Sequence, residues 1–290
     1  MESYFFLFGI GCLWLAFAVI QDLKTREIAN WLTFSLIAIT IVYRAFSAIF
    51  LEQWAFLWWG LLGCAVFVGC AYAFYYSKVF AGGDAKLLMG LGIALPYQSG
   101  NELVIWGSAF LFFLFFGGAL YTLLYSIWLV IPRWRVFRKR FLLELKQQRW
   151  LFLVAGIFTL IILLSVAQVS WLVAIGVGML LAIPFLYAYL QSVERVCMMR
   201  LAKPGELREG DWLAKPIHVA GTTIPVSVHG LSLSDIVLLR RERRAVVIKE
   251  GVPFVPAFLL AYGLMVFFAV VGGLDSSRLS LLLSFLSRVF

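Results

Sequence analysis

The chain has 290 residues, of which 63% are hydrophobic and 13% are charged, and its mean hydropathy is +0.96. Soluble domains are only about half apolar, so this composition excludes a soluble globular protein. Seven apolar runs are long enough to cross roughly 30 Å of hydrocarbon as a helix, and one further run is shorter. We predict an all-α polytopic membrane protein with about eight transmembrane helices, at residues 3–21, 31–50, 54–77, 86–98, 103–132, 150–167, 171–190 and 254–273.

The first run, residues 3–21, is expected to remain in the mature protein. A cleavable signal peptide has a basic segment before its apolar core, whereas the sequence here begins Met-Glu-Ser. Asp22 stands at the end of this run, within QDLKTREIANW.

The net charge is +9, and connections rich in Lys and Arg alternate along the chain with connections that have none. Two, two, seven and ten Lys or Arg occupy residues 22–30, 78–86, 133–149 and 191–253. The positive-inside rule places these segments in the cytoplasm, provided that 86–98 is a full crossing and the N-terminus lies outside. Membrane topology therefore explains the charge, and we expect no nucleic-acid partner. We expect Arg44, near the outer end of the second run, to snorkel outward to water.

The stretch KVFAGGDAKLLMGLG, residues 78–92, places Asp84 after two glycines and before an apolar run. Gly82 and Gly83 lack a Cβ atom, so another backbone can approach closely and the chain can adopt conformations that other residues resist. Asp84 alone also fits an ordinary helix N-cap.

The basic stretch 133–149 is expected to be a cytoplasmic topology determinant that favours anionic lipid head groups. Residues 191–253 are polar enough for a small cytoplasmic α+β segment. Gly and Pro punctuation predicts two or three strands within 203–230, and then a helix capped by Ser232 or Ser234 and a strand at AVVIK. The predicted domains are 1–132, a membrane core that contains Asp22 and Asp84; 133–190, a basic cytoplasmic loop with two further spans; 191–253, a small cytoplasmic domain; and 254–290, a C-terminal span and tail.

We expect no metal site and no cofactor. The four cysteines lack the CxxC spacing of zinc sites and disulfide frameworks, and the two histidines have no third ligand nearby. These residues are Cys12, Cys64, Cys70, Cys197, His218 and His229.

Asp22 and Asp84 are the most informative residues. Burying a carboxylate at the bilayer centre costs about 2.5 kcal/mol or more, so a carboxylate in or beside a span is a candidate functional residue. The predicted topology puts both at the cytoplasmic edge of a span. Two carboxylates that meet in a low-dielectric site share a proton. One can then accept a proton from an attacking water while its protonated partner donates to the scissile carbonyl. The alternative for Asp22 is a weak surface pair with Lys24 or Arg26.

These residues resemble the type IV prepilin peptidases and archaeal preflagellin peptidases, GxGD aspartic proteases, and most closely the archaeal members. DLKTREIANWLT (22–33) is similar to the family's aspartate followed by Ile-Pro-Asn, and AGGDAKLLMGLG (81–92) is similar to GxGD-x-K. The resemblance implies that Asp22 and Asp84 are catalytic, supported by Gly82, Gly83 and Lys86.

The chain departs from the family pattern at two positions. Ala81 stands where the first glycine of GxGD is expected, and Ala29 where proline is usual. The resemblance covers roughly residues 5–130. The family's long four-cysteine loop is absent, which favours cleavage without N-methylation.

The resemblance implies an aspartic endopeptidase in the cell membrane with its active site facing the cytoplasm. It would remove the short basic leader, a class III signal peptide, from prepilin-like or prearchaellin precursors. The expected partners are these precursors and the lipid bilayer, and the sequence leaves the oligomeric state open.

One alternative is an ion- or proton-coupled transporter that uses the same aspartates. Another is the presenilin and signal-peptide-peptidase group, although Gln21 replaces its tyrosine. A non-catalytic scaffold would leave the pair of aspartates unexplained.

Overall fold

The computed structural model describes residues 2–165, 171–227 and 229–271, which form two compact units. Of the described residues, the first unit contains 2–123 and 252–271, and the second contains 124–251. The domain boundaries predicted from the sequence stay a prediction.

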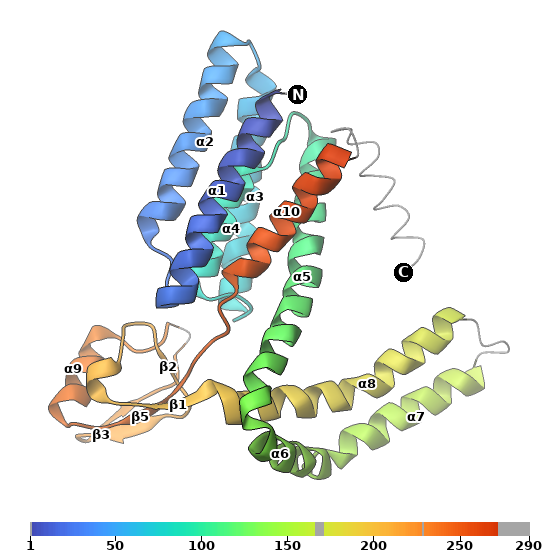
Figure 1. Cartoon of the computed structure of the whole chain (residues 1–290), viewed down its shortest axis with the longest axis vertical. Helices are drawn as coiled ribbons and strands as arrows, with labels where there is room; N and C mark the ends of the chain where they lie inside the picture. Colours follow the sequence, from blue (N-terminus) through green and yellow to red (C-terminus); the bar gives the residue numbers. More distant parts are fainter. Residues whose placement is uncertain (1, 166–170, 228, 272–290) are drawn as a thin grey trace. The chain divides into compact units, whose positions relative to one another are not determined.

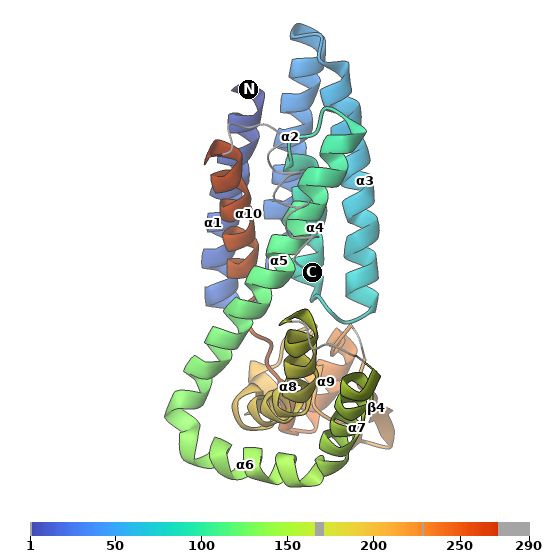
Figure 2. The same ribbon diagram turned by 90° about the vertical axis from the view of Figure 1, so that its right-hand side faces the viewer.

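The first unit is a bundle of helices, seen in two views in Figures 1 and 2. The fourth helix contacts the first three, and the last helix packs along the first. These helices are α1 (Glu2–Thr25), α2 (Asn30–Phe50), α3 (Trp54–Tyr76), α4 (Gly82–Ala94), the first part of α5 (Gly100–Val130) and α10 (Val255–Val271).

All eight predicted apolar runs form helices, but eight membrane crossings are not confirmed. Within the described residues, five helical stretches are long and apolar enough to cross a membrane. The chain is therefore a multi-pass membrane protein, mostly helical, with a small α+β segment. Helix α4 has 13 residues, or about 20 Å at 1.5 Å per residue, which is less than the hydrocarbon thickness. Residues 166 and 167 of the run 150–167, residues 272 and 273 of the last run, and the predicted tail after it lie outside the described residues.

Helix α4 packs closely against α3 through two glycines. A Cβ atom on Gly92 would collide with Phe67 and lie 3.1 Å from the carbonyl oxygen of Gly63. A Cβ atom on Gly63 would in turn collide with Tyr97. Small residues let membrane helices approach each other in this way, so α4 is fixed in its depth and rotation.

Arg44 does not snorkel outward, so that prediction is wrong. Its side chain is fully buried and donates hydrogen bonds to the carbonyl oxygens of Ile93 at 3.0 Å, Leu95 at 2.5 Å and Phe56. Its guanidinium also lies 4.1 Å from the centre of the Phe56 ring. The last carbonyls of a helix have no partner within it and carry partial negative charge. The end of α4 therefore provides acceptors that hold the cation inside the bundle.

The second unit contains the end of α5 and several further helices. The basic stretch 133–149 forms a helix that leaves the end of α5 at a wide angle (Figure 2). The remaining helices are η1 (Ile131–Arg133), α6 (Trp134–Gln147), α7 (Arg149–Ser165), α8 (Trp171–Val193), and the short turns η2 (Glu194–Met198) and η3 (Pro204–Glu206).

The α+β part of the second unit has a buried core of its own around Leu213, Leu239 and Ile248. Three strands form an antiparallel sheet in the order β1-β5-β2, and β3 pairs with β4. The predicted helix is confirmed with Ser232 as its N-cap, in a capping box with Asp235. The strand predicted at AVVIK is also confirmed, whereas β1 was not predicted. These elements are β1 (Met199–Ala202), β2 (Trp212–Leu213), β3 (Ile217–Val219), β4 (Thr222–Ile224), α9 (Leu233–Arg241) and β5 (Val246–Lys249).

We predict that Arg44→Met lowers the free energy of unfolding in detergent by about 3 kcal/mol or more, because it leaves several buried carbonyl oxygens without donors. These acceptors belong to the backbone, so an apolar side chain cannot replace the interaction. Arg149→Met, at an exposed arginine, is the control and should change stability by about 0.5 kcal/mol or less. Equal effects of the two substitutions would contradict this account of Arg44.

Candidate active site

Asp22 lies in the last turn of α1 and is buried, with 7% of its surface exposed. Its Oδ2 atom accepts a hydrogen bond of 3.1 Å from the backbone N–H of Val255, the first residue of α10. A helix N-terminus favours a negative charge, and a buried carboxylate needs a donor. The start of α10 therefore holds one oxygen of Asp22 in a fixed position.

Asp84 lies in the first turn of α4 and is partly buried. The backbone N–H of Ala81 donates to its carboxyl group, and Asp84 is close enough to Asp22 for the two charges to interact. Helices α1 and α4 are in contact. Among the described contacts, no hydrogen bond joins the two carboxyl groups. The structure thus brings together two acidic side chains that are 62 positions apart in the sequence.

Gly82 and Gly83 begin α4, and neither has a positive φ. In this structure neither residue uses the conformational freedom of glycine. The two glycines differ in the space around them. A Cβ atom on Gly83 would lie only 3.3 Å from the Cδ1 atom of Ile28. A Cβ atom on Gly82 would lie 3.8 Å from its nearest neighbour, an atom of Tyr75. The missing side chain of Gly83 thus lets the loop between α1 and α2 approach the start of α4.

Lys86 points to the first residue of α2. Its Nζ atom donates a hydrogen bond of 2.7 Å to Oδ1 of Asn30. This contact joins the two sequence motifs, since Asn30 belongs to the first and Lys86 to the second. In this structure, the bond to Asn30 makes Lys86 a tie between α4 and α2.

The two departures from the family pattern cause no backbone strain. Ala81 is exposed and extended, with φ −71° and ψ 164°, a conformation open to any residue. Ala29 has φ −65°, which suits proline, but its N–H donates a 3.0 Å hydrogen bond to Oε1 of Gln21. Proline has no N–H, so alanine at this position permits a contact that the usual residue cannot make.

The sequence did not reveal that the start of α10, with Phe254 just before it, contributes to this site. Val255 is 233 positions from Asp22, and its contribution is a backbone N–H, which carries no side-chain signal. Phe254 stacks near Phe80, with ring centres 5.6 Å apart, so the same segment also contacts the loop that leads to Asp84.

The chemistry available here is that of two neighbouring carboxyl groups beside helix ends. Within the described residues, no three His, Cys, Asp or Glu side chains form a group that could hold a metal ion. Two carboxyl groups in a partly buried site can share a proton and act as acid and base toward a water molecule.

Comparisons with known proteins agree with the sequence motifs. Residues 9–132 match the sequence model of the type IV leader peptidase family. A preflagellin peptidase of Methanocaldococcus jannaschii is 29% identical over 91 residues, and one of Methanococcus maripaludis is 31% identical over 87 residues. No solved structure gives a significant match. The resemblance to this family is therefore confirmed for the segment that carries Asp22 and Asp84.

The comparisons cover only part of each protein. The two alignments include 31% and 30% of this chain, and this chain spans 38% and 37% of the lengths of the two relatives. Helix α10 lies outside the residues that match the family, although its first residue binds Asp22.

We predict that Gly83→Ala and Gly82→Ala have opposite effects on stability. The added Cβ atom at position 83 presses on Ile28 and should lower the free energy of unfolding by about 1 kcal/mol. At position 82 the space is open, and replacing glycine in a helix should be neutral or stabilising by up to about 1 kcal/mol. Thermal or chemical unfolding of both variants in the same detergent provides the measurement. A loss of stability at position 82 as large as that at position 83 would be evidence against this packing.

Proposed function

We propose that this protein is a membrane aspartic endopeptidase that removes the short basic leader from prepilin-like or prearchaellin precursors. The observation that carries the proposal is that Asp22 and Asp84 lie on two contacting helices, near enough for their charges to interact, within the segment that matches the leader peptidase family. The names of the two relatives point to the same class of reaction. Cleavage takes place at the cytoplasmic membrane interface and proceeds without N-methylation.

In the proposed mechanism the two carboxyl groups share one proton. The ionised carboxylate accepts a proton from water as the water oxygen attacks the scissile carbonyl carbon. The protonated partner donates its proton to the carbonyl oxygen, which gives a tetrahedral diol. Collapse of this intermediate breaks the C–N bond and the leaving amine takes a proton from the pair. One hydroxyl of the diol gives its proton back to the pair as it becomes the carbonyl of the new carboxyl group. The pair then returns to its starting state, so the reaction needs no metal and no covalent intermediate.

The topology proposed from the charge pattern suits such a substrate. With eight crossings, all four basic connections lie in the cytoplasm, and so do the ends of α1 and α4 that carry Asp22 and Asp84. A precursor with a basic leader and an apolar helix has its cleavage point where the leader meets the membrane. Residues 1–132 form the proposed peptidase core, and the segments 133–190, 191–253 and 254–290 are its additions.

The proposal predicts that Asp22→Asn and Asp84→Asn each lower cleavage by about 100-fold or more, since each removes one half of an acid–base pair. The assay follows conversion of a purified precursor with a class III signal peptide by enzyme in proteoliposomes. Glu52→Gln, at an exposed carboxylate in the loop between α2 and α3, is the control and should cleave at the normal rate. Near-normal cleavage by either aspartate variant would refute the proposal. Proton flux in the same vesicles without proteolysis would favour a transporter instead.

Val255 provides a second test, because only its backbone N–H contacts Asp22. Proline is tolerated at the first position of a helix, so Val255→Pro should remove the donor without breaking α10. We expect kcat to fall about tenfold or more, since a hydrogen bond to a charged group is lost, while KM stays nearly unchanged. Val255→Ala keeps the N–H and should retain kcat. Equal kcat values in the two variants would show that the N–H does not position Asp22.

A further inference from the structure

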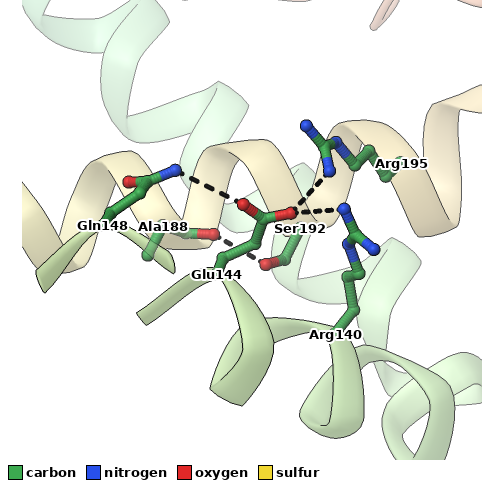
Figure 3. Close-up of polar contacts among 6 residues, drawn as sticks. All are labelled: Arg140, Glu144, Gln148, Ala188, Ser192 and Arg195. Atoms are coloured by element: carbon green, nitrogen blue, oxygen red, sulfur yellow. Dashed lines mark hydrogen bonds and ion pairs between the residues drawn. The ribbon is translucent and has the colours of Figure 1, made fainter. Parts of the chain in front are cut away.

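Helix α6 is joined to the turn η2 at the end of α8 by an ionic cluster around the buried Glu144, shown in Figure 3. The side chain of Glu144 on α6 is 1% exposed, and its Oε1 atom lies 2.7 Å from a nitrogen of Arg140 and 2.9 Å from a nitrogen of Arg195. Gln148 donates a 3.3 Å hydrogen bond to the other carboxylate oxygen. Removing one partner from such a buried group is costly, so the cluster keeps α6 against the end of α8.

An apolar cavity of about 370 Å³ lies beside this joint. It is lined by residues of the end of α5, the turn η1, α6 and α8, namely Ile127, Val130, Ile131, Trp134, Phe137 and Tyr189. Phe137 packs edge-on against Tyr189, with ring centres 5.6 Å apart, and the Tyr189 hydroxyl is 2.8 Å from that of Ser126. The volume is within the range of about 300–1,000 Å³ found for ligand sites. The cavity is therefore preformed by packed side chains.

Exposed positive charge surrounds the aromatic wall of this cavity. Arg138 lies one helical turn after Trp134, so these two side chains are neighbours on the surface of α6. Arg133 directly precedes Trp134. Among the described residues, neither arginine forms an ion pair, in contrast to Arg140, whose charge is taken up by Glu144. Two exposed arginines therefore adjoin Trp134, which lines the cavity, and we call this pair the rim of the cavity.

We propose that this cavity binds one anionic phospholipid, with an acyl chain against the apolar wall and the phosphate group between Arg133 and Arg138. Arginine presents several N–H donors in a planar fork that matches phosphate oxygens. Trp and Tyr residues typically lie at the head-group level of a membrane, as Trp134 and Tyr189 would in this arrangement. A basic amphipathic helix next to a spanning helix is a typical site for anionic lipid. The basic leader of a precursor is excluded as the occupant, because its charge has the same sign as the rim.

The proposal is tested by native mass spectrometry of the purified full-length protein in detergent. Phosphatidylglycerol and phosphatidylcholine with identical acyl chains are added in separate titrations, so the two arms differ only in the head group. We expect one phosphatidylglycerol to be retained at concentrations where phosphatidylcholine is not. The double variant Arg133→Gln/Arg138→Gln should weaken this binding about 30-fold, at roughly fivefold for each basic group near the membrane surface.

The matched control is Lys146→Gln/Arg149→Gln, which removes two exposed cations from the other end of the same basic stretch. It should retain the preference for phosphatidylglycerol. Equal retention of the two lipids by the unmodified protein would overturn the proposal, and so would equal losses in the two double variants, which would indicate non-specific attraction. A second test is Ile127→Trp, which fills the cavity and should lower retention of phosphatidylglycerol even though both arginines remain. Unchanged retention in that variant would place the lipid elsewhere.

Discussion

The C-terminal end of helix α4 is the constraint on which the first unit depends. A helix that ends inside an apolar bundle leaves carbonyl oxygens without partners, and water is not available there to bind them. Arg44 from α2 binds the carbonyl oxygens of Ile93 and Leu95. The hydroxyl of Tyr262 from α10 lies 3.4 Å from the carbonyl oxygen of Ala94 and 3.1 Å from the carbonyl oxygen of Leu7. Two side chains from distant parts of the sequence therefore satisfy the end of this short helix and connect it to α1, α2 and α10.

This arrangement also determines where α4 begins. Because its C-terminal end is bound by Arg44 and Tyr262 and its side is packed on α3 through Gly63 and Gly92, the first turn cannot slide along the bundle. The first turn carries Asp84, and the end of α1 carries Asp22. Helix α10 makes two of these contacts: the Tyr262 hydroxyl binds the C-terminal end of α4, and the N–H of Val255 binds Asp22. The separation of the two aspartates is therefore controlled by packing throughout the bundle.

Much of this could be predicted from the sequence, because apolar runs and capping residues act locally. The eight helical runs and the Ser232 cap depend on short-range patterns and were correct. The charge pattern put Asp22 and Asp84 on one side of the membrane, and the structure brings them close together, although their catalytic role stays a prediction. The environment of Arg44 could not be predicted, since a sequence shows a cation near the end of a run but not the buried carbonyl oxygens that another helix supplies. The number of crossings is not confirmed, and it depends on α4, whose 13 residues end where Arg44 and Tyr262 bind its last carbonyl oxygens.

Helix α10 contacts Asp22 although it lies outside the residues that match the family. The residues that match the family, 9–132, contain both aspartates but not the donor that holds Asp22. A backbone N–H can come from any residue except proline, so the contact with Asp22 does not depend on which side chain stands at position 255. Pro256 at the second position of the helix has no N–H, and the N–H of Ala257 is bound to the carbonyl of Phe254. Val255 thus offers the N–H of this turn that reaches Asp22, which makes the beginning of α10, rather than its side chains, the feature that a functional site at Asp22 requires.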